Sequence, residues 1–371
     1  MRYLFVVLLI FVTACSGPDL NPIEKTTLSA HPAMLQVWHD PNAYEVQILF
    51  TEIERDSVGK AIFTDHSFAV NDSVYFYPAS TVKLPAAILA LESLSQQEAL
   101  TPTTPYKIAG DSIAHTLASD IAEIFAVSDN EAYNRIYEWL GRDYMNKQLR
   151  SKGIKGRLAH RLSTENSARS KRDSVIFTLE QRDTIFTGTD TPISSLSALK
   201  NSKKGKAYMR DGSRVATPMD FSEKNYLPLK SLHDLTKRLF FPEAFKAEEC
   251  FQLSKANKKL LFENMKTVPR KLGYEEASYP DGYGKFFIYG DTEERIPETM
   301  HIYNKVGYAY GTLTETAYVH DTERNIEFIL SATILVNKNQ IFNDDIYEFD
   351  TVGIPFLAQL GREMYLHMLQ K

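Results

Sequence analysis

The sequence predicts an α/β (α+β) fold, with an antiparallel sheet built from both ends of the chain and helices between them. The first observation is a hairpin pattern: residues 45–53 and 61–64 are β-rich and flank a turn-like segment, 57–60. The second is helical spacing of apolar residues in three later segments. These segments are 84–94, 114–127 and 131–149.

The third observation lies near the end of the chain. Residues 302–305, 312–319 and 326–336 resemble strands separated by turns, and 351–369 has the pattern of a closing helix. Strands at both ends must share one sheet if they are to bury a common face, so helices flank that sheet and the central helices form an all-helical subdomain.

Composition excludes several classes of protein. With 43% hydrophobic residues, 21 Phe and 20 Tyr, the 371-residue chain can bury a large core. Its 42 basic and 47 acidic residues offer no basic face for nucleic acid. No Cys/His cluster has metal-ligand spacing, and no metal or organic cofactor is implied. Cys15 and Cys250 are the only cysteines, and we expect Cys250 to be a buried, inert thiol.

The N-terminus indicates export. A cationic start, an apolar run from Leu4 to Val12 and small residues before Cys15 are typical of a lipoprotein signal whose cysteine is acylated. The alternative is a transmembrane anchor, but the nine-residue run is shorter than the roughly 20 residues that a spanning helix needs. We therefore expect a signal peptide at 1–14, a lipid-anchored tether at 15–30 and a location at the bacterial cell envelope, facing the periplasm, with the outer membrane favoured.

Three Ser-x-x-Lys pairs occur, and their settings differ. Ser57/Lys60 falls in the predicted hairpin turn and Ser197/Lys200 in a Ser/Lys-rich loop. Ser80/Lys83 opens an apolar helix, which puts the hydroxyl and the amine one turn apart on the same face. A serine can be activated by a lysine in this arrangement. The alternative is that Ser80 only caps the helix.

Two further motifs occur later in the chain. Ser128-Asp129-Asn130 lies at the junction of two predicted helices, where it could present polar groups to a cleft or cap the second helix. Lys305-Val306-Gly307 ends a predicted strand, where a glycine allows a ligand to approach the backbone. The other Lys-x-Gly matches, at 203–205 and 271–273, lack a strand.

Taken together, the three motifs resemble the class A β-lactamase and penicillin-binding-protein family of serine hydrolases. The resemblance implies a hydrolase domain over 31–371 with an enlarged insertion at about 166–229. Within that insertion we expect a hairpin (174–179 and 183–187) and a solvated basic loop, 194–212.

The resemblance also assigns roles. It makes Ser80 the acylated nucleophile, Lys83 its base or electrostatic partner and Ser128 the proton relay to the leaving nitrogen. The remaining residues bind the substrate. Asn130 would hold its amide and the Lys83 amine, Lys305 its carboxylate with Gly307 beside it, and the N–H groups of Ser80 and Tyr308 would form the oxyanion hole.

Two departures from the family concern its chemistry. Val306 stands where the family usually has a Thr or Ser hydroxyl that helps to bind the carboxylate. The family's water-activating Glu also lacks a clear counterpart: aligning Arg157-Leu158 puts Leu162 in its place, and Glu165 lies three residues further on. Without that Glu, an acyl-enzyme would hydrolyse slowly.

The sequence thus predicts an exported serine hydrolase that opens β-lactam rings through an acyl-enzyme at Ser80. Two alternatives remain open. One is a D-Ala-D-Ala-type peptidase or esterase with slow β-lactam deacylation. The other is a non-catalytic, cell-envelope binding lipoprotein on the same fold.

Overall fold

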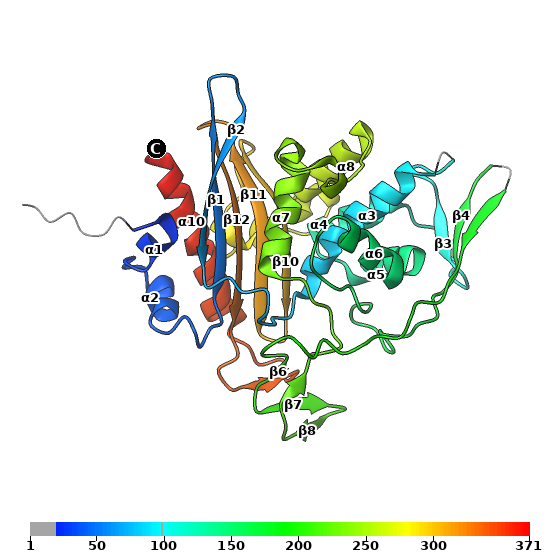
Figure 1. Ribbon diagram of the computed structural model, residues 1–371, viewed down its shortest axis with the longest axis horizontal. Coiled ribbons are helices and arrows are strands. Elements are labelled where there is room, and N and C mark those ends of the chain that lie inside the picture. Colours follow the sequence, from blue (N-terminus) through cyan, green and yellow to red (C-terminus); the bar gives the residue numbers. More distant parts are fainter. Residues whose placement is uncertain (1–19, 98, 181) are drawn as a thin grey trace, which may run out of the picture.

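The computed structural model describes residues 20–97, 99–180 and 182–371 (Figure 1). Its centre is a five-stranded sheet in the order β10-β11-β12-β1-β2, with every neighbouring pair antiparallel. The predicted sheet from both termini is therefore confirmed, and the N-terminal hairpin pairs with the last of the three C-terminal strands. The strands are β1 (Gln47–Arg55), β2 (Ala61–Phe68), β10 (Met300–Ala309), β11 (Thr312–Asp321) and β12 (Ile326–Leu335).

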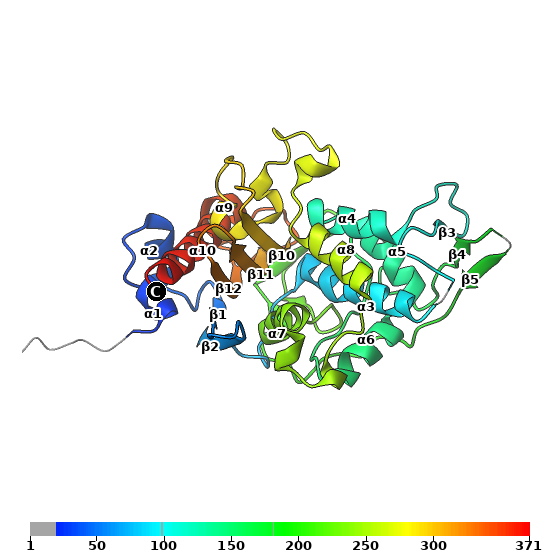
Figure 2. The same cartoon turned by 90° about the horizontal axis from the view of Figure 1, so that it is seen from above.

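One face of the sheet is covered by the two ends of the chain (Figures 1 and 2). Its apolar core joins Phe50 and Phe328 of the sheet to Phe356 of the closing helix. The predicted closing helix begins slightly later than expected, after a π-helical turn at Phe349–Gly353. The helices on this face are α1 (Pro22–Thr26), α2 (Pro32–Trp38), α9 (Phe286–Tyr289) and α10 (Ile354–Leu369).

The expected tether extends too far along the chain. Asn21 caps α1, and Ile23 is fully buried in the core beside α10. Because an apolar side chain held in the core fixes its segment, the folded domain includes residues 21–30 rather than starting at 31. Residues 1–19, which contain the signal and Cys15, lie outside the described residues.

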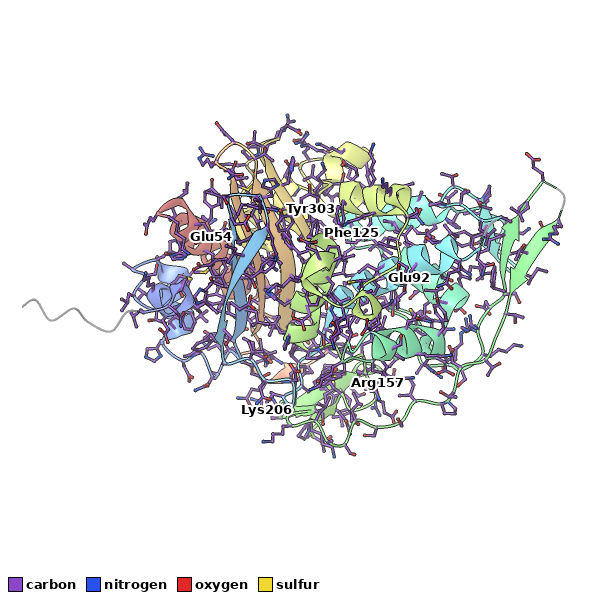
Figure 3. The ribbon with its side chains drawn as sticks, turned by 45° about the horizontal axis from the view of Figure 1, so that its top comes forward. Glu54, Glu92, Phe125, Arg157, Lys206 and Tyr303 are labelled. Atoms are coloured by element: carbon purple, nitrogen blue, oxygen red, sulfur yellow. The ribbon has the colours of Figure 1, made fainter. Side chains whose placement is uncertain are left out.

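The other face of the sheet supports the helical subdomain (Figure 2). Helix α7 lies against β1, β11 and β12, and α3 runs through the centre of the subdomain with nearly all of its residues buried. Figure 3 labels Tyr303 on β10 and Phe125 on α4 at the junction, where Tyr303 packs against the subdomain's core. The helices are α3 (Lys83–Ser95), α4 (Leu117–Ala126), α5 (Asn130–Leu140), α6 (Arg142–Ser151), α7 (Leu229–Phe240) and α8 (Lys255–Met265).

The single helix expected over 131–149 is two helices, α5 and α6. Gly141 separates them with φ +74, a left-handed conformation that favours glycine. A Cβ at this position would lie 2.6 Å from Oδ1 of Asp190. Both the backbone conformation and the contact with Asp190 therefore favour glycine at this break.

The insertion contains more strands than expected. Its predicted hairpin is confirmed and gains β3 as a third strand, and the predicted basic loop carries short strands. Lys204 in that loop is only 4% exposed and pairs with Glu45, so the segment is not uniformly solvated; Lys206 of the same segment is exposed (Figure 3). The remaining strands are β3 (Tyr106–Ile108), β4 (Val175–Thr178), β5 (Asp183–Phe186), β6 (Lys203–Lys204), β7 (Ala207–Arg210), β8 (Ser213–Val215), β9 (Met219–Asp220) and β13 (Ile341–Phe342). Strands β3 and β13 lie outside the insertion and pair with its strands β4 and β7.

One further observation concerns membrane-spanning helices, and another concerns Cys250. Among the described residues, no helix combines the length and apolar character that crossing a membrane requires. Cys250 is buried, as expected, and its thiol lies 3.4 Å from the carbonyl oxygens of Pro242 and Lys246. Burial raises the pKa of this thiol, which makes it less reactive.

Candidate active site

Ser80 lies in a tight turn at the start of α3. A 3₁₀ turn, Ala79–Val82, precedes the helix, and Ala79 has φ +45. A non-glycine residue in this region costs on the order of 1–3 kcal/mol and persists only where the surroundings enforce it. Thr81 Oγ1 donates to the Pro78 carbonyl at 2.5 Å, whereas no side chain caps α3. Ser80 is therefore not a helix cap, and its side chain is partly exposed.

Lys83 reaches the Ser128-Asp129-Asn130 segment from one turn further along. The side chain is 0% exposed. Its Nζ donates to Oδ1 of Asn130 at 2.6 Å, contacts Oγ of Ser128 at 3.3 Å and donates to the Ser128 carbonyl. Burial lowers the pKa of Lys83 to about 7, although the nearby Asp129 favours the charged form. A substantial fraction of the amine is thus neutral near pH 7.

The three residues of the Ser-Asp-Asn motif make different contacts. Asp129 is the N-cap of α5 and accepts a bond from the Ala132 N–H at 2.7 Å. Because Asp129 caps the helix, Ser128 and Asn130 are free to contact Lys83. Ser128 has φ +58, a second strained position beside the same amine.

Lys305 completes the cluster from strand β10. Its side chain is 2% exposed, and Nζ donates to Oγ of Ser128 at 2.8 Å and to the Val306 carbonyl at 2.9 Å. Burial and the positive charges of Lys83 and Lys285 hold the pKa of Lys305 well below its usual value. The Ser128 hydroxyl therefore lies between two lysine amines, a position suited to passing a proton.

Gly307 allows β10 to cross the Ser80 turn closely. A Cβ on Gly307 would lie 2.7 Å from the Pro78 carbonyl oxygen and 2.8 Å from the nitrogens of Ser80 and Thr81. Only glycine fits this approach without displacing one backbone from the other. The Lys-x-Gly at 305 differs from its copies in what its glycine approaches: Gly205 lies against Gln340 and Phe342, and a Cβ on Gly273 would meet nothing within 4 Å.

The segment after Arg157, in which the water-activating Glu was expected, places a serine beside Asn130. Oγ of Ser163 accepts a bond from Nδ2 of Asn130 at 2.8 Å. Leu162, which the alignment placed there, is buried in the helical core, and its backbone pairs with the Asn134 side chain. The structure therefore places Ser163, and not Leu162, beside Asn130. Glu165 is exposed to solvent.

A buried carboxylate on helix α5 anchors this segment. Glu138 on α5 accepts bonds from Arg161 (Nη2, 2.9 Å), Arg169 (Nη2, 2.8 Å) and the Asp173 N–H (2.8 Å). The charged and hydrogen-bonded carboxylate fixes both ends of the loop on the same helix. Sequence reasoning missed this anchor, as it missed Ser163, because the partners lie far apart in the chain.

The last of the predicted site residues, Tyr308, comes directly after Gly307 on β10. Its ring is 46% exposed and lies edge-on to Phe286 and Phe349. The structure thus brings Lys83, Ser128, Asn130 and Lys305 into one hydrogen-bonded cluster beside the Ser80 turn, with Gly307 in contact with that turn. The oxyanion role of the Ser80 and Tyr308 N–H groups stays a prediction.

Comparison with known proteins points to one family. A model of the β-lactamase enzyme family matches residues 42–191. The resemblance to that family is confirmed. A search of curated protein sequences finds no match.

Solved β-lactamases share the fold of this chain. The β-lactamase from Sphaerobacter thermophilus superposes with a TM-score of 0.50 at 12% identity, covering 90% of this chain and 94% of its own. An ancestral class A β-lactamase superposes with a TM-score of 0.50 at 13% sequence identity, covering 90% of this chain and 98% of its own. The β-lactamase from Desulfarculus baarsii superposes with a TM-score of 0.50 at 13% sequence identity, covering 90% of this chain and 97% of its own. At these identities the structures establish the fold of the chain.

We predict that Gly307→Ala separates β10 from the Ser80 turn and lowers the rate of covalent labelling by about 10²-fold, since small misplacements at reacting centres have effects of this size. The measurement is labelling by a fluorescent penicillin. Gly284→Ala is the matched control, because its Cβ would meet nothing nearer than 3.7 Å. Equal labelling of both variants would show that the close approach is unimportant.

We predict that acylation depends on pH through Lys83. If neutral Lys83 accepts the Ser80 proton, the acylation rate should rise with pH up to about 7 and then level off, because the neutral fraction of an amine grows until its pKa is passed. Stopped-flow measurement of adduct formation across this range tests the prediction. Acylation that is independent of pH between about 5 and 8 would remove Lys83 as the base.

Proposed function

We propose that this protein is an exported serine hydrolase that opens β-lactam rings through an acyl-enzyme at Ser80. The observation that carries the proposal is the Lys83 amine, which is buried between the Ser80 turn and the pair Ser128/Asn130. A buried amine with a pKa of about 7 is suited to accept a proton at neutral pH. A binding protein has no need to desolvate a lysine in this way.

In the acylation step, Ser80 Oγ attacks the lactam carbonyl carbon and its proton passes to Lys83 Nζ. The carbonyl oxygen becomes an oxyanion that the N–H groups of Ser80 and Tyr308 stabilise. When the C–N bond breaks, the nitrogen receives a proton through Ser128 Oγ, which is in contact with Lys83 and Lys305. The products of this step are an ester at Ser80 and an amine that stays attached to the ring-opened substrate.

Substrate recognition is assigned to three groups. Lys305 attracts a carboxylate, Gly307 lets the substrate approach the backbone, and Asn130 binds the side-chain amide. In the structure, the Asn130 amide donates to Ser163 and accepts from Lys83. A substrate amide would therefore compete with Ser163 for Nδ2 of Asn130.

In the second step a water molecule attacks the ester, releases the ring-opened acid and restores the Ser80 hydroxyl. The residue beside Asn130 on the loop is Ser163, whose hydroxyl is a weaker base than a carboxylate. This favours slow deacylation. It also keeps a D-Ala-D-Ala-type peptidase or esterase as the second candidate function, since both use the same first step.

We also propose that Cys15 is lipidated and that the protein is anchored to the cell envelope on the periplasmic side, with the outer membrane favoured. The short apolar segment Leu4–Val12 and the small residues before Cys15 support this proposal. Two or more acyl chains on one cysteine are enough to anchor a protein stably to a membrane.

We predict that Ser80→Ala abolishes covalent labelling by penicillin and leaves the fold intact. The change removes one hydroxyl that caps no helix, so the free energy of unfolding should change little. Mass spectrometry detects the adduct and circular dichroism checks the fold, with Ser57→Ala and Ser197→Ala as controls. An adduct on the Ser80→Ala variant, or one mapped to Ser57 or Ser197, would reject the nucleophile.

We predict a burst of acylation followed by slow turnover, because loss of a positioned general base typically costs roughly 10²–10⁴-fold. Time-resolved mass spectrometry with benzylpenicillin should show a long-lived adduct whose lifetime is the same in Glu165→Gln and in the control Glu131→Gln. Fast turnover that Glu165→Gln converts to a trapped adduct would make Glu165 the base. Fast turnover indifferent to Glu165 would contradict the slow step altogether.

We predict that Cys15→Ser moves the protein from the membrane fraction to the soluble periplasmic fraction, or leaves it unprocessed, because the acylated thiol is lost. Cell fractionation and N-terminal mass analysis provide the measurement. The lipoprotein proposal fails if the mature chain begins elsewhere and still sediments with membranes.

A further inference from the structure

The proposed lipid anchor lies very close to the folded domain. Cys15 precedes Leu20, the first residue that the structure describes, by five positions, and Ile23 is already fully buried in the core beside α10. Five residues reach at most about 17 Å when they are fully extended. A lipidated Cys15 would therefore keep the bilayer next to the surface around α1, because the linker is too short to let the domain move freely.

Three helices form the end of the molecule around α1. Helices α1 and α2 both pack on α10, and both views place α1, α2 and the C-terminal end of α10 together, with the small sheet β3–β5 at the opposite end (Figures 1 and 2). Ser29 Oγ, in the connection between α1 and α2, donates to Glu363 Oε1 of α10 at 2.8 Å. Segments from the two ends of the sequence thus share one outward surface.

Four leucines are exposed on these three helices and their connection. They are between 44% and 73% exposed, and they account for four of the eleven large hydrophobic side chains that are exposed in the described part of the chain: Leu28, Leu35, Leu366 and Leu369. Leu28 comes directly before Ser29, and Leu366 lies one turn after Glu363, so the Ser29–Glu363 hydrogen bond holds their segments together. Leu369 follows Leu366 by one more turn on the same face of α10. Exposed apolar side chains grouped in this way are typical of interaction surfaces.

The position of the anchor identifies the bilayer as the partner of this surface. Because the linker is short, lipid stays within about 17 Å of this end, at an effective concentration that a freely diffusing protein does not match. Lys25 is exposed one turn before Leu28, and an ammonium beside apolar side chains suits the phosphate level of a bilayer. None of the three helices has the length and apolar character needed to cross a membrane, so the contact expected is with the membrane surface.

We propose that the end of the molecule formed by α1, α2 and the last turns of α10 rests on the lipid bilayer, with the four leucines among the lipid headgroups. The active-site cluster lies on the other face of the central sheet, where Lys305 meets Ser128 of the helical subdomain. Contact at the α10 end therefore turns the active site away from the membrane. The inference rests on the proposed lipidation of Cys15, but an artificial anchor allows the contact to be measured without it.

The test measures fluorescence quenching on vesicles. The chain from Ser16 carries an N-terminal hexahistidine tag and is bound to vesicles of phosphatidylethanolamine and phosphatidylglycerol that contain a nickel-chelating lipid, so the anchor has its natural position without acylation. A bimane label on Leu28→Cys or on Leu366→Cys reports proximity to lipids that carry a nitroxide on the headgroup. Ile185→Cys, which is 60% exposed on β5 at the opposite end, is the matched control. The chain without an added cysteine measures any labelling of the buried Cys250.

Addition of the nitroxide lipid should quench the labels at positions 28 and 366 several-fold more strongly than the label at 185. The double variant Leu28→Glu, Leu35→Glu should remove most of the quenching at 366, because carboxylates oppose burial among apolar groups. Ile113→Glu, Ile185→Glu, which places two carboxylates at exposed apolar positions near the opposite end, should leave it unchanged. Circular dichroism checks that each variant is folded.

Equal quenching at 28 and 185, or quenching at 366 that the two double variants change alike, would overturn the proposal. Sedimentation velocity of the untagged chain from Ser16 should show no dimer that depends on these leucines. A dimer that dissociates in Leu28→Glu, Leu35→Glu would assign the surface to a second copy of the chain and also overturn it. If the fractionation of Cys15→Ser rejects the lipoprotein, the proposed anchor fails, while the vesicle measurement still decides whether this surface contacts lipid.

Discussion

The burial of the Lys83 amine is the constraint on which the rest of the site depends. A fully buried lysine must find acceptors for its N–H groups, and they come from the Ser128 carbonyl, the Ser128 hydroxyl and the Asn130 amide. That requirement joins the start of α3 to the start of α5. Ser128, whose carbonyl accepts a bond from this amine, has strained backbone with φ +58.

The sheet contributes a second buried lysine to the same site. Lys305 shares the Ser128 hydroxyl with Lys83, so two amines that repel each other lie around one oxygen. Such a cluster is stable only if some protons are given up or if negative charge lies nearby. The lowered pKa values of Lys83 and Lys305 correspond to the first of these.

The loop that faces Asn130 bears on the hydrolysis of the acyl-enzyme. Glu138 fixes its two arginines, and Asn134 fixes the backbone of Leu162, so Ser163 has little freedom to move away from Asn130. The same anchoring leaves Glu165 on the solvent side. Under the proposed function, a rigid loop that presents a hydroxyl rather than a carboxylate to Asn130 favours an acyl-enzyme that forms faster than it is hydrolysed.

The sequence alone determined the sheet from both termini and the choice of Ser80 among three similar pairs. Both arise from local properties: β-strand and helical periodicity report which face is buried, and a serine that opens an apolar helix brings its i+3 lysine to the same side. It placed the ends of the helices less well, since the segment expected as one helix over 131–149 is broken at Gly141, whose positive φ the apolar spacing does not report.

Tertiary structure decided the contacts between distant residues. It put Ser163 rather than Leu162 beside Asn130, folded residues 21–30 onto α10, and buried Lys204 against Glu45. The physical reason is that burial and charge pairing depend on which surfaces meet, and periodicity along one segment reports only that a face is buried, not what covers it.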